Sequence, residues 1–263
     1  MDWLIGCDPE VFVKQDGTFR SAHGLIKGDK KNPFPVRNGA VQVDGMALEF
    51  NITPASTEEE FSINVQDVYN QMKLMVPTYE VVATPVAHFT EEYMKMQPME
   101  ALELGCDPDF NAWTGAVNDK PNAFRPMRTA SGHVHIGWTD GEDVQNPSHT
   151  GMCKAAITQM DFFLGIPSLF YDDDQERREM YGKAGCYRPK PYGVEYRTLS
   201  NAWLKSEKLM RWVFRNAVEG MNRLASGDNL VTRHGDVQDI INNGDKQAAL
   251  YIIEQEGIEV CYG

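Results

Sequence analysis

The sequence predicts an α+β protein in which one curved antiparallel β-sheet is flanked by α-helices. Four β segments each carry two polar residues at positions i and i+2 between apolar neighbours, so each strand has one polar and one apolar face. Other segments repeat apolar residues at the spacing of a helix. Four such strands favour a single sheet whose concave polar face forms a site. The pairs are Asp8/Glu10, Glu49/Asn51, His133/His135 and Glu195/Arg197.

The composition narrows the class of protein. With 263 residues, of which 42% are hydrophobic, the chain can bury a sizeable core in one large domain or two small ones. Its net charge of −13 argues against nucleic acid or an anionic membrane as the main partner. No apolar run approaches a membrane span and no signal pattern opens the chain, so we expect a soluble, cytoplasmic protein. The five scattered cysteines, without a CxxC pair, predict reduced thiols.

The first predicted strand covers residues 3–13. Pro9 lies inside it, which indicates an edge or a bulge. Asp8 and Glu10 share one face, and such acid pairs can hold Mg²⁺, which prefers oxygen ligands; the alternative is a solvent-facing strand surface. An Asp-Gly pair at 16–17 then predicts a hairpin turn.

A loop and a second β segment follow. Residues 20–40 are rich in Gly, Pro and Lys, and the lysine cluster that includes Lys27 either meets an anionic substrate or is simply solvated. Residues 41–52 predict β structure with a turn near Asp44. Glu49 stands in an apolar run, where an acid is costly to bury unless it is paired or bound to a cation.

Helical spacing predicts a helix that starts after an N-cap at 56–57 and runs to about residue 75. Its Met and aromatic stripe is interpreted as core packing. Residues 79–87 predict another strand. Residues 104–110 partly repeat residues 5–11, which is weak evidence for an internal repeat.

The stretch that begins at Arg128 carries two histidines on one strand face. His133 and His135 alternate with apolar residues, and Gly132 and Gly137 flank them where a ligand or another backbone could approach closely. Two imidazoles with an arginine upstream indicate part of a site for a metal and an anion; a solvated edge strand is the alternative.

After residue 150 the sequence predicts helices, a Pro/Gly loop and a further strand. A Pro/Gly loop over 183–193 carries Arg188, and it leads into a strand over 194–204. Arg178 either pairs with the aspartates at 172–174 or binds a phosphate. Residues 258–262 are expected to add a short strand. The predicted helices cover about 151–164, 175–182, 205–225, 237–242 and 245–255.

The predicted polar face indicates metal and phosphate chemistry. Carboxylates suit Mg²⁺ or Mn²⁺, and arginines suit a phosphate that is being transferred. The sequence contains neither a GxGxxG motif nor a P-loop, so a nucleotide would be held by a different architecture.

Four motifs in this order resemble the carboxylate–amine ligases of the glutamine synthetase and glutamate–cysteine ligase superfamily, in particular the phage-type amidoligases. They lie within residues 3–13, 41–53, 125–138 and 165–204. The resemblance implies a glutamine-synthetase-like catalytic fold in a single domain over 1–263, with a helical C-terminal part from about 205 to 263. The motifs are Gly-x-Asp-Pro-Glu-x-Phe, Leu-Glu-Phe-Asn, Gly-His-Val-His-Ile-Gly and Glu-Tyr-Arg-Thr-Leu-Ser-Asn.

The resemblance also implies roles for individual residues. Asp8 stands where the family often has glutamate, so its reach is shorter, and Asp44 is a weaker metal candidate than Glu49. His135 corresponds to the histidine near the carboxylate substrate, and Arg197 to the arginine that stabilises the transferring phosphoryl group. The implied metal ligands are Asp8, Glu10, Glu49, His133 and Glu195. The resemblance implies Arg188, Arg178 and Arg128 as further contacts to phosphate or substrate. The lysine-rich loop, independently of the resemblance, adds Lys27 as an expected contact to the nucleotide.

The implied activity is an ATP- and Mg²⁺-dependent (or Mn²⁺-dependent) ligation of a carboxylate to an amine through an acyl phosphate. The two substrates could be small molecules or peptides, and the family leaves both monomers and oligomers open. If the chain is phage-encoded, it would act in the host-cell cytoplasm. The alternatives are a guanidino or carboxyl kinase on the same fold, a metallohydrolase built on the histidine strand, and a non-catalytic phage protein that retains the fold.

Overall fold

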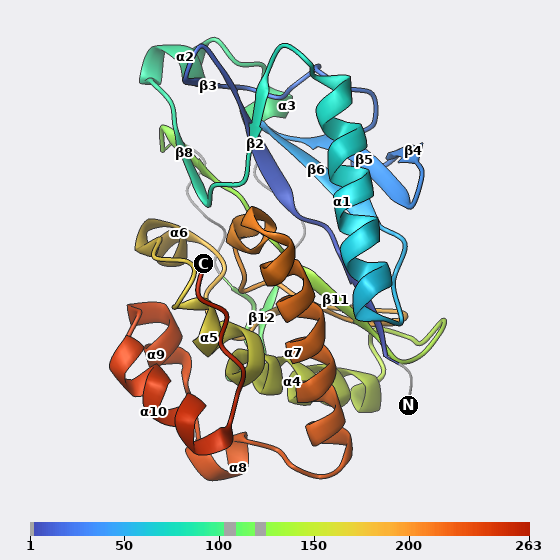
Figure 1. Ribbon diagram of the computed structural model, residues 1–263, viewed down its shortest axis with the longest axis vertical. Helices are drawn as coiled ribbons and strands as arrows, with labels where there is room; N and C mark the ends of the chain where they lie inside the picture. Colours follow the sequence, from blue (N-terminus) through green and yellow to red (C-terminus); the bar gives the residue numbers. More distant parts are fainter. Residues whose placement is uncertain (1–2, 103–108, 119–124) are drawn as a thin grey trace.

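The computed structural model describes residues 3–102, 109–118 and 125–263. It has mixed helices and antiparallel sheets, which confirms the α+β class (Figure 1). The expectation of one curved sheet is wrong, because the described strands form a five-stranded, a six-stranded and a two-stranded sheet. The four polar pairs are therefore divided between two sheets and the segments beside them.

The five-stranded sheet has the order β1-β11-β13-β12-β9, and all its pairings are antiparallel. The predicted loop at 183–193 contains one of these strands. Pro189 is tolerated there because β9 pairs only with Cys186 and Tyr187, which leaves the strand edge beside the proline without a partner in this sheet. The bounds are β1 Leu4–Cys7, β9 Phe110–Asn111, β11 Val134–Gly137, β12 Cys186–Lys190 and β13 Gly193–Tyr196.

The six-stranded sheet begins where the predicted strand over 3–13 divides at Pro9. The Asp16 and Gly17 residues adopt φ values of 51° and 74°, which confirms the predicted hairpin turn. The turn near Asp44 is also confirmed. This sheet contains β2 Glu10–Gln15, β3 Thr18–Arg20, β4 Phe34–Val36, β5 Gly39–Asp44, β6 Ala47–Ile52 and β7 Glu80–Val82. The small sheet pairs β8 Val86–His88 with β10 Met127–Thr129.

The predicted helices are present, with shifted ends. The Thr57 side chain accepts a hydrogen bond from the Glu60 amide, so the predicted N-cap is confirmed. A π-helical turn at Asp161–Gly165 follows α4, and a 3₁₀ turn at Asn201–Lys205 replaces the end of the strand predicted over 194–204. The helices are α1 Glu58–Met75, α2 Glu91–Lys95, α3 Met99–Leu102, α4 Pro147–Met160, α5 Ile166–Ser168, α6 Gln175–Met180, α7 Glu207–Ala225, α8 Val231–His234, α9 Gln238–Asn243 and α10 Lys246–Glu256.

The C-terminal segment is not the strand expected over 258–262. The Glu259 carbonyl accepts hydrogen bonds from Trp212 Nε1 and Asn216 Nδ2 on α7, so side chains rather than a strand satisfy this backbone group. The repeat predicted at 104–110 lies almost entirely outside the described residues. None of the helices in the described ranges combines the length and hydrophobicity that a membrane crossing requires.

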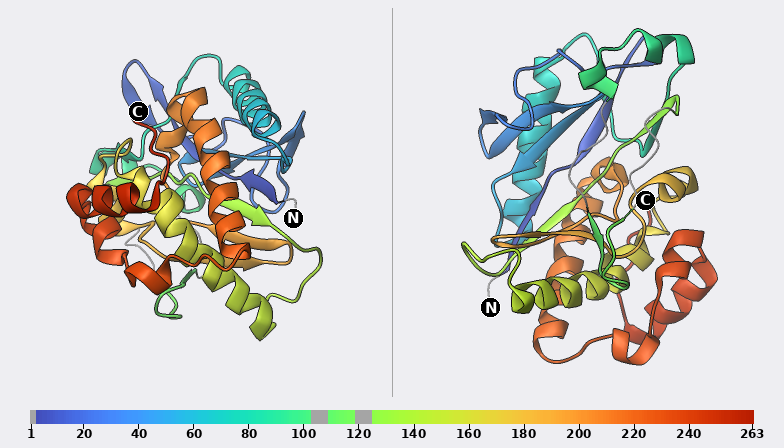
Figure 2. Two further views of the ribbon diagram at one scale, coloured as in Figure 1. Left: turned by 60° about the horizontal axis from the view of Figure 1, so that its bottom comes forward. Right: turned by 180° about the vertical axis from the view of Figure 1, so that it is seen from behind.

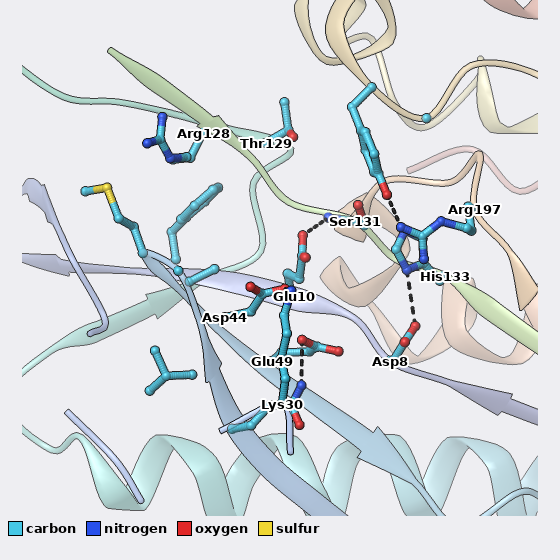
Figure 3. A pocket seen from close by; sticks show the side chains of 18 of the residues that line it. Asp8, Glu10, Lys30, Asp44, Glu49, Arg128, Thr129, Ser131, His133 and Arg197 are labelled. Atoms are coloured by element: carbon cyan, nitrogen blue, oxygen red, sulfur yellow. Dashed lines mark hydrogen bonds and ion pairs between the residues drawn. The ribbon is translucent and has the colours of Figure 1, made fainter. Parts of the chain in front are cut away.

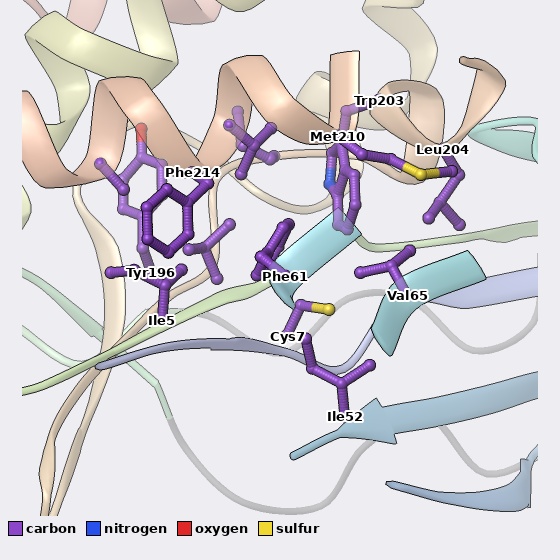
Figure 4. Close-up of a cluster of buried hydrophobic side chains, with 14 of the residues drawn as sticks. Ile5, Cys7, Ile52, Phe61, Val65, Tyr196, Trp203, Leu204, Met210 and Phe214 are labelled. Atoms are coloured by element: carbon purple, nitrogen blue, oxygen red, sulfur yellow. The ribbon is translucent and has the colours of Figure 1, made fainter. Parts of the chain in front are cut away.

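The core lies between the sheets and helices α1 and α7. Phe61 on α1 has its ring centroid 6.2 Å from that of Trp203 in the 3₁₀ turn and 5.8 Å from that of Phe214 on α7, so it joins α1 to both segments (Figure 4). A separate hydrophobic cluster packs α8–α10 against the π-helical turn. The six-stranded sheet and the C-terminal helices lie at opposite ends of the molecule (Figure 2).

Candidate functional site

A cavity of 1380 Å³ is lined by side chains from both larger sheets. This volume exceeds the range of about 300–1,000 Å³ that is common for small-molecule pockets, so the cavity has room for a nucleotide and a second ligand. Most of the residues predicted to form the site line it (Figure 3). These are Asp8, Glu10, Glu49, Arg128, His133, Arg188 and Arg197.

The β1–β2 junction brings the two sheets together at this cavity. Pro9 interrupts the pairing of the segment, and the Glu10 amide donates to the Ser131 carbonyl at 2.9 Å. The Ser131 amide in turn donates to Glu10 Oε2 at 2.7 Å. Asp8 is therefore held beside the histidine strand, and Glu10 is held at the start of the other sheet.

One group of potential ligands lies on the five-stranded sheet. His135, Glu195 and Arg188 are direct register partners on β11, β13 and β12, so their side chains form a row across the sheet. Asp8 reaches this row, with its Oδ1 at 3.0 Å from His135 Nε2. Ligand atoms of Asp8, His135 and Glu195 lie within 4.8 Å of one another, and we call these three residues the histidine cluster.

His133 lies beside the same two acids. Its Nδ1 lies 3.3 Å from Asp8 Oδ1 and 3.4 Å from Glu195 Oε1, so it stays a predicted metal ligand next to the histidine cluster. Burial and the nearby Arg197 lower the pKa of His133 to about 4, so this imidazole is neutral. Its Nε2 is buried without a hydrogen-bond partner among the described residues. This nitrogen is therefore available as a ligand.

Cations surround the buried Glu195. Lys190 Nζ lies 2.8 Å and Arg188 Nη1 3.6 Å from Glu195 Oε2, and Arg197 contacts the other oxygen. Burial by itself would raise the pKa of Glu195, but the charge of Arg197 lowers this pKa to about 2. The carboxylate is therefore ionised and already partly neutralised.

Arg197 is fixed from three sides. Its Nε donates to Asp109 Oδ2 at 3.1 Å, and its two terminal nitrogens contact Glu195 and the Tyr181 hydroxyl. The side chain is almost completely buried but lines the cavity. A guanidinium held in this way is ready to meet an anion without reorganising.

The second group of potential ligands lies on the six-stranded sheet. Oxygen atoms of Glu10, Asp44 and Glu49 lie within 4.8 Å of one another, and we call these residues the carboxylate cluster. Burial and the Asp44 charge raise the pKa of Glu10 to about 7, and burial with the neighbouring acids raises that of Glu49 well above its usual value. Gln42 donates to Glu49 at 2.8 Å. Crowded carboxyl oxygens of this kind suit a hard divalent cation.

The two clusters differ in charge. The carboxylate cluster has three acids and a single ion pair among the described residues, between Asp44 and Lys30. The acids of the histidine cluster are paired with arginine, lysine and histidine. Electrostatics therefore favour the carboxylate cluster as the first site for a divalent cation. The histidine cluster offers a mixture of nitrogen and oxygen ligands, and the arginine and lysine side chains beside it suit an anion.

Two residues predicted to bind the nucleotide lie outside the cavity lining. Arg178 is buried, with its Nη2 at 3.4 Å from Asp172 Oδ2, so the predicted alternative of pairing with the aspartates is the arrangement observed. Lys27 is exposed, and Lys30 and Lys31 of the same loop line the cavity in its place.

Arg128 lines the cavity but is largely occupied by backbone. Its Nη1 donates to the carbonyls of Arg125 and Met127 at 3.1 and 2.8 Å, and its Nη2 to that of Leu102 at 3.4 Å. These bonds hold the guanidinium at the wall of the cavity. If Arg128 also contacts a ligand, as predicted, that contact is additional to its structural role in binding these carbonyls.

Several residues of the site carry no signal in the sequence. Asp109 lies far along the chain from Arg197, and Tyr181, which follows α6, lines the cavity and contacts Arg197. Tyr192 forms a hydrogen bond with His135 Nδ1, and their rings stack at a centroid distance of 5.9 Å. Tyr192 lies in the β12–β13 turn, and only the antiparallel pairing of the strands places it over the histidine.

Comparison with known proteins gives one family match. Residues 130–257 match the family model described as Phage phiEco32-like COOH.NH2 ligase-type 2. The matched segment contains both histidines, Glu195 and Arg197, and it confirms the resemblance to phage-type carboxylate–amine ligases. No match was found among curated proteins.

Proposed function

We propose that this chain, whose residues 130–257 match the phage-type carboxylate–amine ligase model, joins a carboxylate to an amine in a reaction that requires ATP and Mg²⁺. The main support is one arrangement. Asp8, Glu10, Asp44, Glu49, His133 and the fixed Arg197 line a single cavity, although they come from distant parts of the chain. His135 and Glu195 do not line the cavity themselves, but they contact Asp8 and His133, which do.

The donor sets fit divalent cations. Glu10, Asp44 and Glu49 would hold one through oxygen atoms, and Asp8, His135 and Glu195 would hold another through oxygen and nitrogen. A bound cation would supply positive charge to the phosphate oxygens and neutralise the crowded acids. The raised pKa values of Glu10 and Glu49 support this proposal, because they reflect burial and the repulsion between neighbouring acids, which a cation would relieve.

The chain's own cations would then act on the reacting groups. In the proposed reaction, a carboxylate oxygen attacks the γ-phosphorus, the bond to the ADP oxygen breaks, and an acyl phosphate forms. Arg197 is already oriented by its three partners and would offset the negative charge that gathers at this step. Arg188 and Lys190 line the same wall and would orient the anionic groups.

The amine completes the reaction. Its nitrogen attacks the acyl carbon, inorganic phosphate leaves, and the nitrogen loses a proton as the amide forms. No side-chain nucleophile is required. The described cysteines fit this direct route, because Cys7, Cys153 and Cys186 are buried and burial raises the pKa of Cys153 and Cys186 to about 12. An ATP-dependent reaction would place the protein in a cytoplasm, that of the host if the chain is phage-encoded.

Thermal unfolding with and without MgATP tests the nucleotide site. Ligand that binds only the folded state stabilises it by about 2.7 kcal/mol at a hundredfold excess over the dissociation constant. We expect a rise in the midpoint that requires both Mg²⁺ and ATP, that is lost in Glu49→Gln, and that persists in the exposed control Glu254→Gln. No rise at millimolar MgATP would contradict the proposal.

Product analysis separates the proposed ligase from the other activities. We expect ADP and phosphate to be released only when a carboxylate and an amine are both present, with one amide formed per ADP. A stable phosphorylated product without an amine would instead identify a kinase. Hydrolysis of a substrate without ATP would identify a metallohydrolase.

A further inference from the structure

The loop over residues 21–33 delivers an ammonium group to the carboxylate cluster. Lys30 Nζ lies 2.8 Å from Asp44 Oδ2, and the lysine lines the cavity together with Glu10 and Glu49 (Figure 3). Its side chain is 48% exposed, so the charged end reaches the acids from the solvent side. It is the cation that forms an ion pair with this cluster in the described parts of the chain.

The loop is built in a way that fixes this placement. Gly28 has φ of 100°, and a Cβ at this position would lie 2.5 Å from the Val41 carbonyl oxygen, so only glycine allows the loop to lie so close to β5. The Gly28 carbonyl also accepts a hydrogen bond from the Val43 amide at 3.1 Å. The base of the loop is therefore anchored to the strand that carries Asp44.

The tip of the loop is a tight turn. The Asp29 side chain accepts hydrogen bonds from the amides of Lys31 and Asn32 at 2.8 and 2.9 Å. The backbones of Asp29 and Asn32 also exchange two hydrogen bonds, at 3.2 and 3.1 Å. Lys30 projects from this turn, so its backbone is fixed while its four-carbon side chain can still change rotamer.

We propose that Lys30 is a resident counter-ion of the carboxylate cluster, which a divalent cation displaces and which then serves the anion that accompanies the cation. A divalent cation carries twice the charge and takes several oxygen ligands at once, so it outcompetes one ammonium for three carboxylates. The displaced ammonium stays at the cavity wall, next to where phosphate oxygens would meet the cation.

This inference rests on the proposed function in one respect, since it takes the carboxylate cluster as a cation site. It makes a distinctive prediction, because Lys30 would oppose the binding of a cation alone and assist the binding of a cation with an anion. A lysine with a purely structural role would do neither. If Lys30 acted only through its positive charge, without the ion pair to Asp44, its replacement would change cation binding as much as replacement of the neighbouring Lys31.

The test measures Mn²⁺ binding to the whole chain by electron paramagnetic resonance at low ionic strength, in Lys30→Ala, Lys30→Gln, Lys30→Arg and the matched control Lys31→Ala. We expect the first two variants to bind Mn²⁺ alone at least threefold more tightly than the unmodified chain. Lys30→Arg and Lys31→Ala should stay within twofold. In an Asp44→Asn background, Lys30→Ala should no longer tighten binding, because the ion pair is already absent.

Titration with ATP in the presence of Mg²⁺ should show the opposite effect of the same substitution. Lys30→Ala, which tightens the binding of Mn²⁺ alone, should weaken nucleotide binding several-fold. Unchanged or weaker Mn²⁺ binding in Lys30→Ala, or an equal effect of Lys31→Ala, would overturn the inference. Failure of the proposed function is seen separately, as an Mn²⁺ affinity of the unmodified chain that Glu49→Gln does not change. If neither the unmodified chain nor Lys30→Ala binds Mn²⁺, both are wrong.

Discussion

Glu10 and Glu49 are direct register partners on the adjacent antiparallel strands β2 and β6, so two carboxyl groups face each other across the sheet. Like charges directly opposite destabilise a sheet, and burial adds a further penalty for ionisation. The raised pKa values of both residues are the electrostatic result. Such a pair destabilises the fold by itself and is well suited to holding a cation.

Replacing Glu10 should stabilise the cation-free protein in a pH-dependent way. The pKa of Glu10 is raised from 4.5 to about 7 in the folded protein, so the folded state holds this proton more tightly than the unfolded state does. Stability from this group is therefore present at low pH and is lost as the pH rises from about 4.5 to about 7. Glu10→Gln removes the charge and should add about 1–3 kcal/mol to the free energy of unfolding at pH 8.

The measurement is urea denaturation in the presence of a chelator. At pH 4.5 the same substitution should have little effect, and Glu254→Gln, at an exposed position, should have little effect at either pH. An equal gain for Glu10→Gln at both pH values would show that Glu10 is not the source of the pH dependence.

Arg197→Ala should destabilise the fold as well as remove activity. The substitution leaves Asp109 and Glu195 in a buried environment without their shared guanidinium partner. Breaking a buried ion pair in this way costs about 3–5 kcal/mol. The matched control is Arg37→Ala, which breaks a pair with Asp67 whose arginine is 75% exposed, and it should cost less than about 1 kcal/mol. Urea denaturation of both variants tests the difference, and similar losses would contradict the burial argument.

Tyr192→Phe should weaken metal binding at the histidine cluster and leave the fold intact. The Tyr192 hydroxyl engages His135 Nδ1 and so directs His135 Nε2 towards Asp8. Loss of a hydrogen bond that orients a ligand lowers metal affinity about tenfold or more. Titration with Co²⁺, followed by its visible absorption, measures this affinity, with the exposed Tyr251→Phe as control. Unchanged Co²⁺ affinity in Tyr192→Phe would remove this tyrosine from the site.

Gly132→Ala should be much more harmful than Gly137→Ala, although both glycines flank the histidine strand. A Cβ at Gly132 would lie 2.3 Å from both the Ser200 carbonyl oxygen and Trp203 Nε1. At Gly137 the closest atom would be Leu4 Cβ at 3.4 Å, an ordinary contact. We expect a loss of about 2 kcal/mol or more for Gly132→Ala and under about 1 kcal/mol for Gly137→Ala in urea denaturation. Equal losses would refute the close approach of the Trp203 segment.

Local features of the fold were accessible from the sequence because they depend on neighbours in the chain. The N-cap at Thr57, the turn at residues 16–17 and the helix over Glu58–Met75 each follow from residues within one or two turns. The strand at Cys186–Lys190 was not predicted because a proline such as Pro189 usually indicates a loop. Only the tertiary structure shows that the neighbouring strand β9 is too short to pair with the residues near Pro189.

The residue types of the site were also predictable, since acids, histidines and arginine between apolar neighbours are unusual in strands. Their partners were not. Lys30 rather than Lys27 faces the acids because Gly28 anchors the loop on β5, and Arg178 turns to Asp172 because α6 places it away from the cavity. His135 lies beside Glu195 because the two residues are register partners, whereas only the tertiary structure brings Asp8 and His133 to the same place.

The α+β class, most of the elements and the residue types of the site therefore follow from local sequence patterns. The meeting of two sheets at the Asp8–Pro9 junction, and the separation of the acids into two clusters of different charge, follow only from the folded chain. The difference lies in the distance along the chain over which each effect acts. Propensity and periodicity act over a few residues, whereas pKa values and ion pairs depend on groups that only chain folding brings within a few ångströms.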